Sequence, residues 1–212
     1  MTEADINVRL DAAFERFLDV YFRFGGHNYH GWDHQQDPRN FRGPMFWTEG
    51  DCAFRMGLEL EKEFPYCVHY ELPVAAWSFG DFDQRNDKRQ YVDIVVTDLH
   101  GFVEDETSQQ RFQRHLHGLF VEVKYLSAGS SKTWRHDAES KIPSAQADAA
   151  RLVGHLARQH CAVAACLVVD DDGLFGELYD STTWPPNVRL LLANPAELAR
   201  RRLQESVSDS DR

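Results

Sequence analysis

The chain has 212 residues, of which 42% are hydrophobic and 27% are charged, as is ordinary for a globular protein. This length fits one domain, expected at residues 1–205, followed by a flexible polar tail at residues 206–212. The formal net charge of −11 argues against nonspecific coating of nucleic acid, which depends on phosphate neutralisation by Lys and Arg. A site that acts on an anionic ligand remains compatible with this charge, because metal ions and a local basic patch can operate on an acidic molecule.

The N-terminus is acidic and lacks an apolar run, so it does not resemble a secretory signal, and no stretch approaches the length of a membrane span. The four cysteines form no CxxC pair and match no zinc spacing, so they are interpreted as reduced residues of the core. These features predict a cytoplasmic protein that does not contact membranes. The cysteines are Cys52, Cys67, Cys161 and Cys166.

Apolar residues recur at spacings of three and four between Ile6 and Tyr21, which predicts an amphipathic helix. Thr2 with Asp5 is expected to cap its start, and the glycines at 25–26 to end it. Its Phe-rich stripe is expected to pack on the core. The alternative is that it packs on a second subunit, because closed two-fold homodimers are the commonest oligomers.

A long loop is predicted at residues 25–47, and loops of this length are often functional. It holds three histidines between His27 and His34, and histidine is the commonest metal ligand. A hydrolase that uses these histidines is therefore one alternative function. A polar loop without metal is favoured, because the spacing matches no zinc motif.

A second helix is predicted after Thr48, which forms the pattern of a capping box with Asp51. Glu49 lies in its first turn, where its charge would complement the helix dipole. Residues 67–74 predict the first strand, and Pro73 places the far end of that strand at a sheet edge or a bulge.

Two short apolar runs, residues 91–96 and 120–125, predict buried strands that nevertheless contain charges. Glu122 and Lys124 alternate with apolar residues, so they share one face of their strand. Charges inside apolar strands carry a desolvation cost that a structural role rarely requires. Asp93 adds a third charge in the other strand. If the strands are neighbours, two carboxylates and a lysine meet, which suits Mg²⁺ and phosphodiester hydrolysis.

The triplet Glu122-Val123-Lys124, with Asp93 in the preceding strand, resembles the motif of the PD-(D/E)XK nucleases, which have the restriction-endonuclease-like fold. The proline often written before the upstream acid is absent, since Val92 stands there. The order of the predicted elements agrees with the family, because a helix carrying a glutamate precedes the first strand. A helix and then a strand also follow the lysine, so the resemblance covers residues 48–170.

The resemblance implies a Mg²⁺-dependent nuclease that cleaves DNA, with Mn²⁺ as a substitute ion and RNA as an open second substrate. Asp93 and Glu122 would hold the metal, Lys124 would place the attacking water, and Glu49 would assist as a further ligand or through water. The main alternative is a catalytically silent module that keeps the fold for binding. Six cations are expected either to contact nucleic acid or to serve structural or solvated roles: Arg85, Lys88, Arg89, Lys132, Arg135 and Lys141.

The last third of the chain predicts a helix at residues 144–160 and an almost wholly apolar strand at 162–169, which needs cover on both faces. A solvated turn at 170–173, a strand at 188–193 and a short basic helix at 196–204 follow. The sequence therefore predicts an α/β domain whose central mixed β-sheet is flanked by helices. The resemblance implies a restriction-endonuclease-like core within it.

Overall fold

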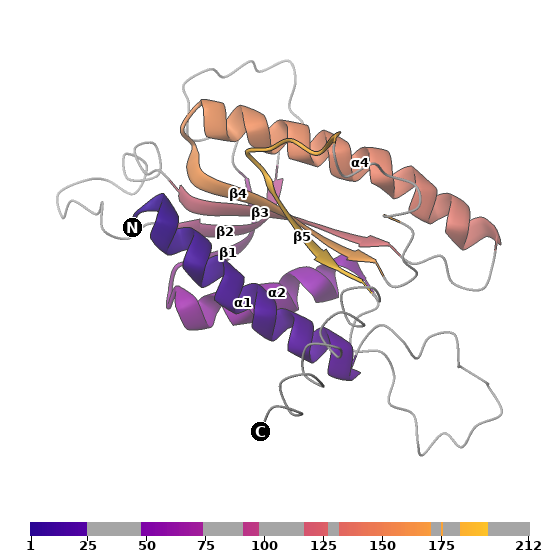
Figure 1. The fold of residues 1–212 in the computed structure, drawn as a ribbon, viewed down its shortest axis with the longest axis horizontal. Coiled ribbons are helices and arrows are strands. Elements are labelled where there is room, and N and C mark those ends of the chain that lie inside the picture. Colours follow the sequence, from indigo (N-terminus) through magenta and orange to yellow (C-terminus); the bar gives the residue numbers. More distant parts are fainter. Residues whose placement is uncertain are drawn as a thin grey trace, which may run out of the picture.

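The computed structural model describes residues 1–24, 48–73, 91–97, 117–126, 132–170, 175 and 183–194. Within these residues, five strands form one mixed sheet and three long helices pack on its two faces (Figure 1). The predicted α/β class, with a central mixed sheet flanked by helices, is confirmed. The helices are α1 (Glu3–Phe24), α2 (Glu49–Glu63) and α4 (Lys132–Ala157), and the strands are β1 (Val68–Pro73), β2 (Tyr91–Thr97), β3 (His117–Leu126), β4 (Cys161–Asp170) and β5 (Arg189–Ala193).

The strands lie in the sheet in the order in which they follow along the chain, from β1 to β5. The β1–β2 and β2–β3 pairs are antiparallel, whereas β3–β4 and β4–β5 are parallel. A parallel pair needs a crossover connection, and α4 lies in the connection between β3 and β4. The register of that pair aligns Glu122 with Cys166 and Lys124 with Val168.

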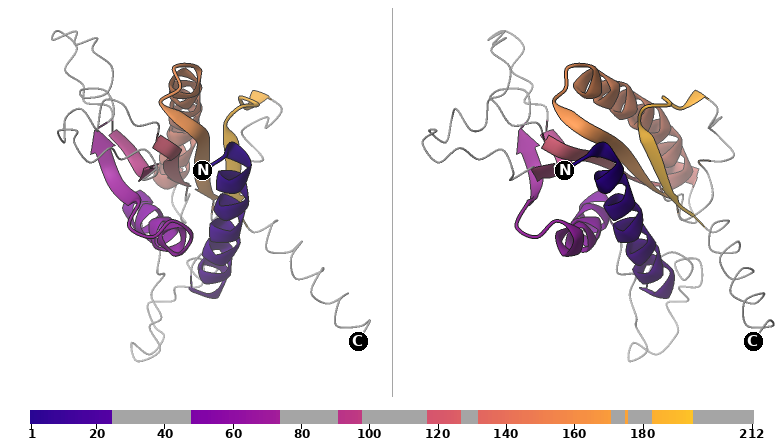
Figure 2. Two further views of the ribbon diagram at one scale, coloured as in Figure 1. Left: turned by 90° about the vertical axis from the view of Figure 1, so that its left-hand side faces the viewer. Right: turned by 60° about the vertical axis from the view of Figure 1, so that its left-hand side comes forward.

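The helices form two layers, with α4 on one face of the sheet and α1 and α2 on the other (Figure 2). Alternation along β3 sends Val121 and Val123 into the apolar cluster under α1 and α2. Phe120 and Leu126 join the cluster under α4. Glu122 and Lys124 therefore lie on the α4 face of the sheet.

α1 begins as the sequence predicts, since the Thr2 hydroxyl accepts from the Asp5 backbone N–H and the Asp5 carboxylate accepts from Thr2. Its apolar stripe is buried, with Phe17 and Leu18 fully inaccessible and Tyr21 2% exposed. The expected packing of this stripe on the core is confirmed. These side chains pack within one chain, and the homodimer stays a prediction.

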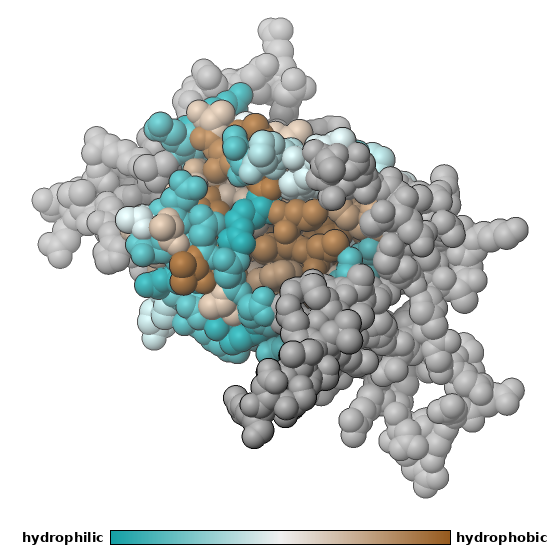
Figure 3. Space-filling model, in the orientation of Figure 1, coloured by the Kyte–Doolittle hydropathy of each residue, from teal (hydrophilic) through white to brown (hydrophobic). Residues whose placement is uncertain are grey.

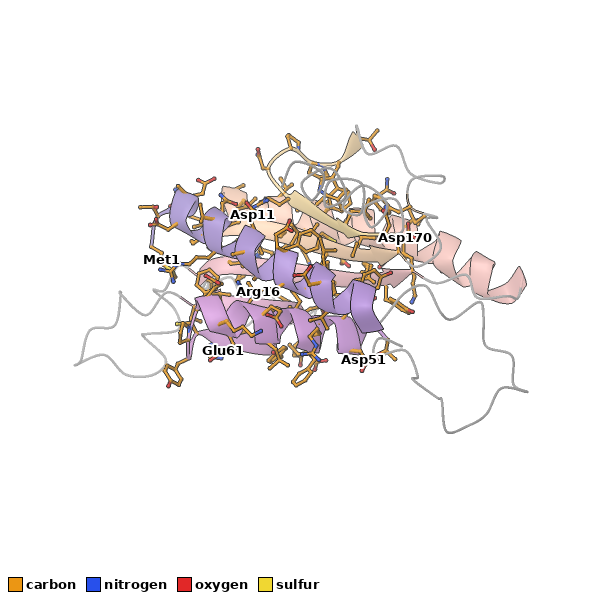
Figure 4. All side chains as sticks on the ribbon, turned by 60° about the horizontal axis from the view of Figure 1, so that its bottom comes forward. Met1, Asp11, Arg16, Asp51, Glu61 and Asp170 are labelled. Atoms are coloured by element: carbon orange, nitrogen blue, oxygen red, sulfur yellow. The ribbon has the colours of Figure 1, made fainter. Side chains whose placement is uncertain are left out.

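Ion pairs hold α1 against its neighbours. Arg16 of α1 lies beside α2 (Figure 4). Its Nε atom is 3.2 Å from Oε2 of the buried Glu59, and its Nη2 atom is 2.7 Å from Oε1 of Glu63. Arg189 of β5 pairs with Asp11 on α1. Figure 3 shows mostly polar side chains on the visible part of α1 and a group of apolar side chains beside it, near β5.

α2 begins with the predicted capping box, in which Thr48 and Asp51 exchange side chain to backbone hydrogen bonds. Gly57 on this helix permits a close approach to β1, because a Cβ there would lie 2.2 Å from the hydroxyl oxygen of Tyr70. The Tyr70 ring therefore rests directly on α2, and its hydroxyl donates to the Phe54 carbonyl at 3.3 Å.

α4 differs from the prediction, because it begins at Lys132 instead of residue 144 and contains Pro143. Proline removes one intrahelical donor and normally marks a boundary, which is why the earlier part was expected to be loop. Pro143 itself is exposed, whereas Ile142 and Ala145 on either side of it are 5% and 0% exposed. Burial on both sides of the proline outweighs the lost hydrogen bond.

All four cysteines are buried and free of disulfides, as predicted for core residues. Burial raises the pKa of the Cys161 thiol to about 12, so this thiol is unreactive. The described helices include none with the length and apolarity needed to cross a membrane. The predicted loop at 25–47, the turn at 171–173 and the helix at 196–204 lie outside the described residues.

Candidate active site

Asp93 lies where the paired register between β2 and β3 begins. In that register Ile94 pairs with Val121, and Asp93 immediately precedes Ile94 on β2. Its Oδ2 atom accepts a hydrogen bond of 2.7 Å from the backbone N–H of Val123. A side-chain carboxylate thus binds a backbone donor of β3, which fixes Asp93 beside the segment that carries Glu122 and Lys124.

Glu122 is a nearly buried carboxyl group on the α4 face of β3, with only 2% of its surface exposed. Its Oε1 atom accepts a hydrogen bond from Nη2 of Arg151 on α4. Burial, followed by the neighbouring charge of Asp93, raises the pKa of Glu122 to about 8, although Arg151 acts in the opposite direction. Asp93 accepts from the N–H of Val123, the residue that follows Glu122, so the two carboxyl groups come from adjacent positions on neighbouring strands.

Lys124 is held by oxygen atoms from three parts of the fold. Its Nζ atom lies 3.1 Å from Oε1 of Glu49 in the first turn of α2 and 2.9 Å from Oδ2 of Asp148 on α4. It also donates to the carbonyl of Val123 at 3.0 Å. Burial disfavours the ammonium form, but the hydrogen bond to Asp148 and the charge of Glu49 raise the pKa of Lys124 above its ordinary value. Lys124 is therefore a fixed cation.

Two residues of α4 belong to the site although the sequence prediction did not include them. Asp148 is 8% exposed and binds Lys124 through Oδ2, while its Oδ1 lies 2.9 Å from Nη1 of Arg151. Arg151 reaches Glu122 in turn. The signal in the sequence is their spacing of three, which places both side chains on one face of a helix.

Together these residues form a continuous chain of alternating charges across the layers of the fold. It runs from Glu49 on α2 through Lys124, Asp148 and Arg151 to Glu122 on β3. Charges this strongly buried require partners, because an isolated one carries a large desolvation cost. The site thus concentrates three carboxylates and two cations in a partly dry environment, beside the carboxylate of Asp93.

The six cations considered for nucleic-acid contact have different positions. The amine of Lys141 donates to the Tyr125 carbonyl at 2.9 Å, so it connects α4 to the end of β3. Lys132 and Arg135 lie in the first turns of α4, but their side chains lie outside the described residues. The predicted turn that contains Arg85, Lys88 and Arg89 also lies outside the described residues.

The donor atoms suit a hard divalent cation. Asp93 and Glu122 supply carboxylate oxygens, and Mg²⁺ usually takes one or two carboxylates and completes its shell with water and phosphate oxygens. Within the described residues, no three side chains of His, Cys, Asp or Glu are grouped to hold one metal ion. Burial, followed by the charge of Asp93, raises the pKa of Glu122, so its ionised form is favoured by a positive partner. Arg151 supplies part of that positive charge.

A buried histidine pair, His155 near the end of α4 and His160 just before β4, is separate from this site. Nδ1 of His155 lies 2.9 Å from Nδ1 of His160, and the His155 ring meets Phe120 edge-on. Burial, followed for His155 by the proximity of His160, lowers the pKa of each imidazole to about 4. Both rings are therefore neutral at pH 7. The predicted histidine cluster between His27 and His34 lies outside the described residues.

No family model, curated protein or solved structure matches this chain. The fold and site place it among α/β proteins with a mixed five-stranded sheet and a buried charge cluster between sheet and helix.

Proposed function

We propose that this protein is a Mg²⁺-dependent nuclease of the PD-(D/E)XK type that hydrolyses DNA phosphodiester bonds. The observation that carries the proposal is the convergence of Asp93, Glu122 and Lys124 at one place on the sheet. Asp93 binds the backbone of β3 and its charge acts on Glu122, while Lys124 follows on the same face of the strand. Two carboxylates and a fixed lysine are the groups that metal-assisted hydrolysis of a phosphodiester requires.

The order of the elements supports a restriction-endonuclease-like core. The order α2, β1, β2, β3, α4, β4 agrees with the helix before the first strand and the helix and strand after the lysine that the resemblance implies. Glu49 supports it as well, because this glutamate of the preceding helix reaches the site and lies 3.1 Å from the Lys124 amine.

In this proposal, Asp93 and Glu122 would hold the ion, which when bound would supply Lewis-acid activation of a phosphoryl oxygen and of water. Lys124 would donate hydrogen bonds to the attacking water or to the phosphate and stabilise charge that develops in the transition state. A role as a general base is not part of its function, because its raised pKa keeps the amine protonated at neutral pH. Glu49 and Asp148 would position the amine.

A second candidate function is a catalytically silent module that uses this fold for binding. It is favoured by one observation, namely that the charges of the site already satisfy one another. Lys124 is bound by Glu49 and Asp148, and Glu122 is bound by Arg151. A cluster of this kind could persist as a structural ion network without a substrate.

Assays of the purified protein on plasmid, single-stranded and branched DNA with Mg²⁺, Mn²⁺ or Ca²⁺ would test the proposal. A nuclease should cut with Mg²⁺ or Mn²⁺ and be blocked by Ca²⁺, which occupies oxygen sites without supporting the reaction. A zinc-selective chelator should leave the activity unchanged, whereas it would stop a hydrolase that depends on the histidines between His27 and His34. Absence of cutting on all three substrates with both Mg²⁺ and Mn²⁺ would favour the silent module.

A further inference from the structure

Arg151 binds the carboxylate that the proposed function assigns to the metal ion. Its Nη2 atom donates to Oε1 of Glu122, and its Nη1 atom lies 2.9 Å from Oδ1 of Asp148. Because Glu122 is only 2% exposed, bulk water does not screen its charge and a positive partner must come from the protein or from an ion. In this structure the positive partner is Arg151.

We infer that Arg151 is a built-in counter-ion that competes with the divalent cation for Glu122 and so sets the metal affinity of the site. This inference rests on the proposed function, because it takes Asp93 and Glu122 as the metal ligands. Arg151 acts through Glu122 and is therefore a positioning residue. It holds the carboxyl group in place without metal, and a cation that takes its place at Oε1 must overcome this ion pair.

The contacts of Arg151 are suited to such an exchange. Asp148 binds Nη1 and lies on the same helix, so the guanidinium keeps one ion pair after Glu122 releases Nη2. The Nε atom is buried and has no acceptor among the described residues. A buried donor without an acceptor costs free energy, so the position beside Glu122 does not satisfy the whole guanidinium. The guanidinium therefore loses less free energy when it moves away from Glu122.

Mn²⁺ binding to the intact protein without DNA provides a direct test, with free Mn²⁺ measured by electron paramagnetic resonance. Arg151→Gln should bind Mn²⁺ more tightly than the wild type by about tenfold, which corresponds to roughly 1.4 kcal/mol. Arg158→Gln is the matched control, because it removes the same charge from an exposed position just after α4. The control should change the affinity much less, since Arg158 does not contact Glu122.

Thermal unfolding adds a second readout. Without metal, Arg151→Gln should unfold at a lower temperature than the wild type, because Glu122 loses its partner, and Mn²⁺ should restore a larger part of that stability than it adds to the wild type. A purely structural arginine would lower the unfolding temperature without this larger response to metal. If Arg151→Gln does not fold, Arg151→Met takes its place, because methionine also removes the charge and adapts its shape to the surrounding side chains.

The outcomes separate this inference from the proposed function. Unchanged or weaker Mn²⁺ binding by Arg151→Gln, or by Arg151→Met where it replaces it, would overturn the inference. DNA cleavage by the wild type would still leave the nuclease proposal intact. Arg151→Gln can be combined with Glu122→Gln in a double variant. If Arg151→Gln binds Mn²⁺ more tightly and the double variant loses this gain, the result supports the counter-ion role, even if no form of the protein cuts DNA and the nuclease proposal fails. Absence of Mn²⁺ binding in every variant would overturn both.

Discussion

Asp148 of α4 forms an ion pair of 2.9 Å with Lys124 of β3, and both side chains are nearly buried. This pair connects the helix layer to the sheet at the position where the proposed chemistry would occur. It gives Lys124 two competing interpretations, as a group that stabilises the reacting phosphate or as a counter-ion of Asp148. The first prediction distinguishes them.

Lys124→Ala should lower the rate of Mg²⁺-dependent plasmid cleavage by roughly 10² to 10³, because it removes one group that stabilises transition-state charge. Mn²⁺ binding should persist, since Lys124 is not a ligand. Lys62→Ala is a suitable control, because Lys62 also pairs with a carboxylate but its side chain is 57% exposed. Cleavage at the wild-type rate by Lys124→Ala, with a loss of roughly 3 to 5 kcal/mol in the free energy of unfolding, would instead assign Lys124 a structural role.

Asp93→Ala should abolish Mn²⁺ binding, because a site with one or two carboxylates depends on each of them. Asp93→Asn is the sharper variant. Its amide oxygen can still accept from the Val123 N–H, whereas the charge that acts on Glu122 is gone. We expect Asp93→Asn to fold like the wild type and to lose the metal, as measured by circular dichroism and by titration with Mn²⁺. Retention of wild-type metal affinity by Asp93→Asn would remove Asp93 from the ligand set.

The histidine pair predicts an acid-dependent loss of stability. The native pKa values of His155 and His160 are about 4, below the ordinary 6.5, so the unfolded chain takes up protons first as the pH falls. The pair should therefore reduce the free energy of unfolding between about pH 6.5 and pH 4, with no further loss from these groups below that range. The pKa of Glu122, raised from 4.5 to about 8, acts in the opposite direction. The native state binds this proton before the unfolded chain does, so Glu122 should add to the free energy of unfolding as the pH falls from about 8 to about 4.5.

Urea unfolding of wild type and His155→Phe across this pH range isolates the histidine contribution. The phenylalanine variant should show a smaller decline in stability on the acid side, since one titrating ring is removed from the pair. Parallel stability curves for the two proteins from pH 7 to pH 4 would contradict the prediction.

Two helical glycines predict opposite effects of the same substitution. Gly57→Ala should lower the free energy of unfolding by about 1 kcal/mol, because the new methyl group displaces the Tyr70 ring that packs on α2. Gly154→Ala on α4 meets no atom within 4 Å and should raise stability by roughly 0.5 to 1 kcal/mol through helix propensity. Chemical denaturation of both variants checks the sign, and equal stabilisation by both would show that Tyr70 moves aside at no cost.

Much of the fold could be predicted because local signals were strong. The capping box of Thr48 and the alternation of charged and apolar residues around Glu122 specify a helix start and a strand face without reference to the rest of the chain. The early start of α4 could not be predicted, because Pro143 is a local signal for a boundary that burial of Ile142 and Ala145 overrides. Local propensity does not include the packing that decides such a case.

The same distinction explains the candidate site. Asp93, Glu122 and Lys124 were found because charges in apolar strands are conspicuous. Asp148 and Arg151 lie on a helix, where charged residues are common on the solvent face, and only the placement of α4 over β3 shows that they are buried partners. Sequence periodicity identifies the face of a helix but not the residues that the face meets.

The strand β1 is paired along one side only among the described elements, which bears on how the protein avoids self-association. An open row of backbone donors and acceptors can recruit a strand from another molecule and start aggregation. Here Glu71 places a charge in the row and has a φ of 49°, and the strand ends at Pro73, which lacks an N–H. These two residues shorten the regular edge to a few positions. Replacement of both Glu71 and Pro73 by β-forming residues such as valine and threonine should therefore lower the highest concentration at which the protein stays monodisperse.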